Sequence, residues 1–417
     1  MGSCLLPVWF ASMAGVGPQL NLLRPEGLDV PMPPSTEKTV VGTRLAHWVD
    51  TDNFTIQWAD DWTTEADAIA AGEALERSWE VLVGEQGWDP PASGTHHKIW
   101  VILDPGLEGT GLTTGFPSVE YPVGLPVIYV NPTYSSDPDF FASLCAHEFG
   151  HALQFLVRDY YEGGPEEAWY WEATSEWMTE IVGPEWNKYA WQTTWYSTAT
   201  TAPYDTVEQY HQYGMLLLNA YLDEYVLGTD GVWDIWWSNQ SRPWLDEFAA
   251  ATGGTIDDLW VDFVGAVGGG LLRESHLYAM PDPAPDSGEV EGYLGSAYVN
   301  LGAVSGSVEV YGGLGTLIRG DQWWALDGAT NVPVGSEDVW VVVTNNSPEP
   351  AEYEVILGPS ITVGEDTGGQ PEDLAEAVET APSRSKAGGC AVARTPTRGG
   401  WLLALLGLVC GVRFRRE

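Results

Sequence analysis

Apolar residues follow two different spacings along the chain, and the change between them divides it into parts. From His47 onward, "HWVDTDNFTIQW", "HHKIWVILDP" and "LPVIYVNP" have the alternating or continuous apolar pattern of strands. Between the first two, "TEADAIAAGEALERSWEVLVGEQGW" has the 3.6-residue spacing of an amphipathic helix, which Thr64 is expected to cap. Another helix should begin at Asp137-Pro138, because proline is favoured at the first helical position.

The next part of the chain is rich in tryptophan and helical in pattern. Candidate helices cover about residues 165–182, 206–226, 231–239, 243–251 and 256–267. Together with the preceding strands they make residues 43–280 one unit of ordinary domain size, expected to be of the α+β class.

The pattern changes again after this unit. Residues 281–292 are rich in Pro, Asp and Gly and predict a linker. Residues 293–360 alternate as short strands and predict a small all-β sandwich, in which the "NNSP" turn at 345–348 indicates a hairpin. Residues 361–389 are a Gly/Pro/Glu stretch without core residues and predict a disordered stalk.

Composition excludes some partners. The chain has 417 residues, of which 44% are hydrophobic, so a sizeable core is available. Its 59 acidic and 17 basic residues give a net charge of −42, which would repel nucleic acid and anionic lipid headgroups. We interpret the acidity mainly as a solubility device of an exported or salt-exposed protein. A structural Ca²⁺ ion is compatible with it, although no motif supports one.

The stretch "LCAHEFGHALQF" carries the first candidate chemistry. Residues four apart lie on one face of a helix, so His147 and His151 can hold one metal ion between them. Glu148 lies about 100° round the helix, beside the metal, where it can act as a general base. This is the H-E-x-x-H arrangement of metallopeptidases. The alternative is a buried helix with two hydrogen-bonded histidines, so the third ligand has to decide.

Two continuations of the motif fit poorly. A metzincin needs Gly and His three and six residues after the second histidine, where this chain has Gln154 and Val157. An aspartate ligand would be Asp258, but Thr255 followed by Asp258 and an apolar run is better explained as a helix cap.

A glutamate from a second helix fits better. In "WYWEATSEWMTE", Glu172 follows His151 by twenty-one residues and Glu176 lies one turn later on the same face. Their bulky apolar neighbours should bury the pair, which is costly unless a cation lies nearby. The H-E-x-x-H helix and this one therefore explain each other as the two halves of a zinc site.

The two motifs resemble the gluzincin group of zinc peptidases. Over residues 43–280, "HEFGHALQF", "WYWEATSEWM" and "YHQYGMLLLNAYLDEY" are similar to uncharacterised secreted metalloproteases of myxobacteria. The resemblance implies a zincin-like domain, with a twisted sheet over the active-site helix and a helical lower half. It also implies Glu172 as the third Zn²⁺ ligand and Glu176 as the acid that orients a ligand histidine. Trp171 departs from the asparagine common there, which leaves the register between the two glutamates open.

Further residues are weaker candidates. Tyr213 or His211 in "YHQYG" could donate a hydrogen bond to the oxyanion. Asn131 is expected on the strand that borders the cleft, where backbone pairing could hold an extended substrate. Cys145 is read as a small buried hydrophobe.

The two ends of the chain predict export. Residues 1–14 resemble a signal peptide that lacks basic residues, and residues 15–42 are a Pro-rich arm. Residues 390–417 combine Gly-Cys, a spacer, a short apolar run and an arginine cluster, and resemble myxobacterial C-terminal sorting tails. The resemblance implies processing near Cys390 and attachment to the outer membrane or cell surface.

The sequence therefore predicts an exported, monomeric zinc metalloendopeptidase that acts on protein or peptide substrates and binds no nucleic acid. Two alternatives stay open. One is a zinc hydrolase of a non-peptide bond, and the other is a surface adhesin that uses the same fold without catalysis.

Overall fold

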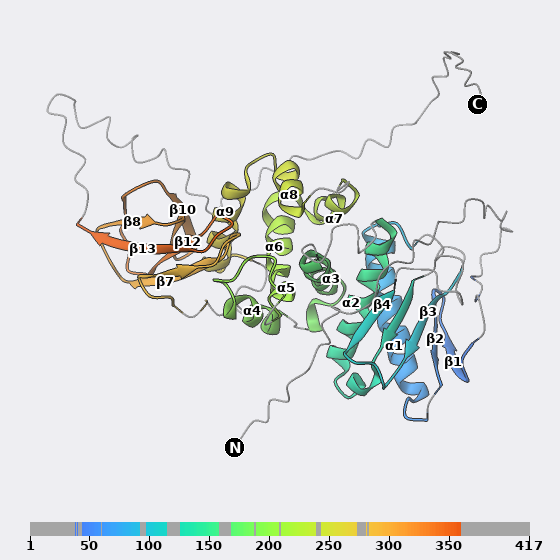
Figure 1. The fold of residues 1–417 in the computed structure, drawn as a ribbon. Helices are drawn as coiled ribbons and strands as arrows, with labels where there is room; N and C mark the ends of the chain where they lie inside the picture. Colours follow the sequence, from blue (N-terminus) through green and yellow to red (C-terminus); the bar gives the residue numbers. More distant parts are fainter. Residues whose placement is uncertain are drawn as a thin grey trace, which may run out of the picture.

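The structure is a computed structural model. It describes residues 38, 40, 44–59, 61–91, 97–114, 126–157, 168–186, 189–207, 210–238, 243–272, 281 and 283–359. The predicted signal peptide, nearly all of the arm, the stalk and the tail with Cys390 lie outside the described residues. Figure 1 shows a sheet with two helices at one end, a group of helices in the middle and an all-β region at the other end.

The first sheet has five strands in the order β1-β2-β3-β5-β4. Strands β2, β3 and β5 run parallel, while β1 and β4 pair antiparallel at the two edges. The strands are β1 (His47–Asp50), β2 (Phe54–Trp58), β3 (Ile99–Leu103), β4 (Gly111–Thr114) and β5 (Val127–Val130). Four of them lie in the three predicted stretches, β1 and β2 both in the first, and β4 is additional.

Two helices cover one face of this sheet. The first, α1 (Glu65–Ser78), begins at Thr64, which forms the predicted cap as a capping box with Asp67. It continues into the π-helical η1 (Trp79–Glu85). The second, α2 (Pro138–Val157), starts at the predicted proline and carries the HEFGH motif. Alternate residues of β3 point into the core beneath these helices, so α2 packs against this face of the sheet.

The middle of the molecule is helical, as the tryptophan-rich pattern predicts. Two differences stand out: α4 was not predicted, and the expected helix at 206–226 is divided into three pieces after Tyr210, whose φ is +64°. No helix among the described residues is long and apolar enough to cross a membrane. The helices are α3 (Ala168–Val182), α4 (Tyr189–Thr198), α5 (His211–Gly214), α6 (Leu216–Tyr221), η7 (Leu222–Leu227), α7 (Thr229–Ser238), α8 (Trp244–Thr252) and α9 (Ile256–Gly268), with short 3₁₀ turns η3 (Pro132–Ser136) and η5 (Pro184–Trp186).

The all-β region consists of two four-stranded antiparallel sheets with an apolar core between them. The orders are β10-β9-β12-β7 and β11-β8-β13-β6. The strands are β6 (Ser287–Val290), β7 (Ser296–Gly302), β8 (Ser307–Tyr311), β9 (Leu314–Arg319), β10 (Gln322–Leu326), β11 (Thr330–Asn331), β12 (Val339–Thr344) and β13 (Ala351–Gly358).

Two expectations for this region are corrected. The predicted linker at 281–292 contains strand β6, which pairs with β13. The hairpin predicted at 345–348 is wrong, because β12 and β13 belong to different sheets. Asn345 explains the difference: its side-chain amide donates to the carbonyls of Val290, Glu291 and Glu349, which fixes a crossing between the sheets instead of a tight turn.

The all-β region packs directly against the helices. Strand β12 is apolar on both faces because Val341 and Val343 point into the sandwich while Val342 joins the main core. Trp323 of β10 donates a hydrogen bond to Asp262 of α9, 3.2 Å away. One core therefore continues from the first sheet through the helices to the outer face of β7, β9, β10 and β12.

This contact can be tested at Gly265 of α9, where a Cβ atom would overlap the indole of Trp323. Gly265→Ala should lower the free energy of unfolding by about 1 to 3 kcal/mol, the usual cost of overpacking a core. Denaturant unfolding measures it, and Gly254→Ala, at an open position, is the control. Equal stability of Gly265→Ala and the wild type would contradict the packing described.

Candidate metal centre

The centre lies where α2 crosses α3, and a small residue permits the crossing. A Cβ on Gly150 would press against Ser175 and Met178 of α3. The Ser175 hydroxyl donates to the backbone carbonyl of His147 and so fastens the two helices at this level. The glycine of HEFGH is thus explained by close packing, which brings His147 and Glu172 together.

His147, His151 and Glu172 converge as the sequence predicted. One carboxylate oxygen of Glu172 lies 3.1 Å from His147 Nε2 and 3.4 Å from His151 Nε2. One ligand atom from each of the three residues lies within 4.8 Å of the others, so this group could hold a metal ion. Two imidazole nitrogens and a carboxylate oxygen form a donor set that suits a divalent transition metal.

The outer nitrogens of the two histidines face different acceptors. Nδ1 of His147 lies 3.2 Å from the carboxylate of Glu176, the residue that the family resemblance implies as an orienting acid. Gln192 of α4 donates to the other oxygen of that carboxylate. Nδ1 of His151 lies 2.7 Å from the side-chain oxygen of Gln154, a contact that the sequence reasoning missed.

Charges at the centre shift two pKa values strongly. Burial disfavours the charged form of His147, but Glu176 and Glu172 outweigh it and raise the pKa of His147 to about 10. Burial likewise opposes ionisation of Glu172, but His151 and His147 hold the pKa of this carboxyl well below its usual range. A metal ion would therefore displace a proton that the carboxylates keep on His147.

Glu148 lies against the edge strand β4. The Thr113 hydroxyl is 2.7 Å from a Glu148 carboxylate oxygen, and a Cβ on Gly111 would overlap that carboxylate. Glu148 is 4% exposed, and burial raises its pKa although His151, His147 and the Thr113 bond act in the opposite direction. Strand β4 is short and has little apolar alternation, so no pattern in the sequence pointed to Thr113.

The two candidates in α5 have different surroundings. The rings of Tyr213 and His147 have centroids 6.0 Å apart, so Tyr213 lies beside the centre. His211 is two residues earlier and faces the other way. It is 2% exposed and stacks on Tyr196 with centroids 5.8 Å apart. The geometry therefore favours Tyr213 as the group that could reach a substrate.

Three other residues are structural. Asn131 follows β5, which pairs with β3 and β4, so Asn131 is not beside the free edge of the sheet. The Asn131 side chain caps η3 and donates to the carbonyls of Leu107 and Gly109. The Asp258 backbone N–H donates to the Thr255 hydroxyl, and this hydroxyl donates to the Asp258 carboxylate. Asp258 is therefore part of a helix cap, the role that the sequence favoured over a metal ligand. Cys145 is fully buried, and burial raises the pKa of its thiol.

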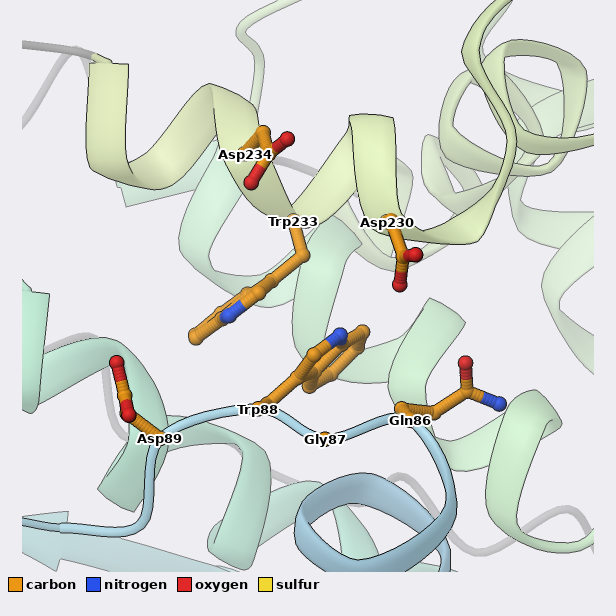
Figure 2. Close-up of a pocket in the computed structure, with 7 residues that line it drawn as sticks. All are labelled: Gln86, Gly87, Trp88, Asp89, Asp230, Trp233 and Asp234. Atoms are coloured by element: carbon orange, nitrogen blue, oxygen red, sulfur yellow. The ribbon is translucent and has the colours of Figure 1, made fainter. Parts of the chain in front are cut away.

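A separate hollow of about 420 Å³ lies between α7 and the segment after η1. Figure 2 shows its walls, with Trp88 and Trp233 between flanking aspartates. The two indoles stack with centroids 4.6 Å apart, and Trp88 also stacks on Trp177 of α3. In the described part of the chain, the aspartates of this hollow do not converge as a metal cluster. They are Asp89, Asp230 and Asp234.

The burial of His211 predicts a pH effect on stability. Desolvation lowers its pKa to about 4, against about 6.5 for an exposed histidine. Between these values the unfolded chain binds the proton and the folded chain does not, so stability falls as pH falls. From pH 7 to 4.5, urea unfolding of the wild type should lose about 2 to 3 kcal/mol more than that of His211→Gln. An equal loss in both proteins would show that His211 is protonated in the folded state.

Comparison with known proteins adds a partial match. Residues 49–244 match a family described as "Family of unknown function (DUF6055)". The match runs from β1 to the start of α8, so it includes α2, α3 and α5 and leaves out the all-β region. No curated protein matches the chain. All residues of the candidate metal centre therefore lie in the matched part of the chain.

Proposed function

We propose that the protein is an exported zinc metalloendopeptidase. The observation that carries the proposal is the meeting of His147, His151 and Glu172 in one partly buried group with the Glu148 carboxylate beside them. A structural metal site closes its coordination with four protein ligands, whereas a catalytic site keeps a position for water. Three protein ligands with a neighbouring carboxylate are the arrangement of the second kind.

The donor set supports zinc as the metal. Two imidazoles and one carboxylate form a three-ligand set known for hydrolytic zinc, and His147 and His151 offer Nε2 on the same side as Glu172. Zinc bound there would supply a water of lowered pKa and polarise the substrate carbonyl.

Glu148 is the proposed general base. Its burial and raised pKa suit a group that takes a proton from the attacking water and returns it to the leaving amine. The Thr113 hydroxyl lies 2.7 Å from Oε2 of this carboxylate and 2.9 Å from the Glu148 backbone carbonyl, so it restrains the orientation of the side chain. Thr113 would thus position Glu148 without touching the reacting atoms.

Strand β4 supports a peptide as the substrate. It is the edge of the first sheet and lies against the Glu148 carboxylate through Gly111 and Thr113. An extended peptide that pairs with this edge would pass its backbone carbonyls by the metal centre. Tyr213, whose ring lies beside that of His147, is the proposed hydrogen-bond donor to the oxyanion. Export to the cell surface remains a proposal based on the tail sequence.

The central test combines metal analysis with Glu148→Gln. We expect one zinc per chain in both proteins, and a loss of about 10²- to 10⁴-fold in casein cleavage by the variant, the range for losing a general base. Glu247→Gln, which changes another buried glutamate, is the control and should keep its activity. Histidines that bind no metal would overturn the proposal. Zinc without proteolysis in either form would favour a surface-binding protein.

Tyr213→Phe tests the oxyanion donor. Because the variant keeps the ring beside His147 and loses only the hydroxyl, kcat should fall about 10²- to 10³-fold with zinc content unchanged. His211→Gln should keep a kcat near that of the wild type at pH 7, since its side chain is buried against Tyr196. Peptide hydrolysis kinetics distinguish the two, and a larger loss in His211→Gln would reverse the assignment.

A further inference from the structure

We propose that Gln154 is a positioning residue that sets the metal affinity of the centre by fixing His151. The proposal rests on the metal site of the proposed function but not on the reaction. Gln154 lies three residues after His151 on α2, on the same side of the helix, and it is fully buried. No sequence motif marks it, because the contact follows from how α2 and α3 cross.

The Gln154 amide makes one hydrogen bond at each end. Its Nε2 donates to the backbone carbonyl of Trp171 at 2.9 Å. Its oxygen therefore faces His151 Nδ1, at 2.7 Å, and can only accept. His151 must then carry its proton on Nδ1, and the lone pair is left on Nε2, which faces Glu172. Gln154 thus selects the tautomer that can bind a metal.

The same amide couples ligands from two helices. The Trp171 carbonyl belongs to the residue before Glu172, so the bond from Gln154 holds the start of that ligand's turn of α3. A displacement of Gln154 would therefore disturb His151 and Glu172 together. Partners of this kind are usually worth about 10- to 100-fold in metal affinity.

The charges at the centre explain why residue 154 is a glutamine. Nδ1 of His147 already faces the carboxylate of Glu176, and Glu148 is buried and Glu172 half-buried at the same centre. A further carboxylate at position 154 would add like charge at low dielectric and would face the Trp171 carbonyl without a donor. An apolar side chain would leave both hydrogen-bond partners unsatisfied. An amide serves both ends without charge.

The experiment measures zinc affinity of the full chain by chelator competition, with Co²⁺ absorption as a report on the ligand set. Gln154→Met, of similar length, should raise the zinc Kd about 10- to 100-fold and change the Co²⁺ spectrum. Gln57→Met is the control, since Gln57 is also fully buried and its side-chain oxygen accepts from the backbone N–H of Leu45, in the first sheet. It should lower thermal stability and leave the zinc Kd within about threefold.

Gln154→Glu separates positioning from packing. It keeps an acceptor for His151 Nδ1 but loses the donor to Trp171, so it should bind zinc more tightly than Gln154→Met despite an equal or lower melting temperature. A zinc Kd in Gln154→Met within threefold of the wild type would overturn the proposal. So would an affinity that follows melting temperature across all three variants. These outcomes do not depend on proteolysis, so failure of the proposed function as a peptidase is seen separately.

Discussion

The structure depends on keeping three carboxylates in one buried place. Glu148, Glu172 and Glu176 approach the imidazoles of His147 and His151 between α2, α3 and the sheet edge. Without positive charge nearby, the desolvation of these acids would cost several kcal/mol each. In the metal-free chain the proton on His147 offsets part of this cost, and a divalent ion would offset more. The centre is therefore a charge arrangement that a cation would complete.

The all-β region at the other end of the molecule supports this group of charges through helix α4. Gln192, which donates to Glu176, lies on α4, and Tyr196 of the same helix meets Tyr298 of β7 through their hydroxyls at 3.1 Å. Gly214 lets α5 approach α4 closely at Tyr196. The all-β region is thus more than an appended module, because it packs against a helix that supplies an outer contact of the metal centre.

The sequence predicted the parts of the fold whose signals are local. Residues that are close in the sequence determine the Thr64 cap, the helix start at Pro138 and the H-E-x-x-H face. Strand β4 and helix α4 were missed because contacts with distant residues stabilise them. Strand β4 forms by pairing with β5. Helix α4 has a mixture of aromatic and β-branched residues that does not by itself favour a helix. The hairpin at 345–348 failed for the same reason, since Asn345 bonds across to the other sheet.

The residues of the candidate site also fall into two groups, those that sequence spacing predicts and those that only the fold identifies. Ligands on one helix are set by a spacing of four residues, and Glu172 could be placed because its helix had to bury an acid. The choice between Tyr213 and His211 needed the left-handed backbone at Tyr210, which sets how α5 meets its neighbours. Gln154 could not be chosen at all, because a glutamine on an apolar helix has no spacing rule. Only the carbonyl of Trp171, on another helix, determines which end of its amide faces His151. Orientation of the ligands is thus a property of the crossing of α2 and α3, while their identity is a property of the sequence.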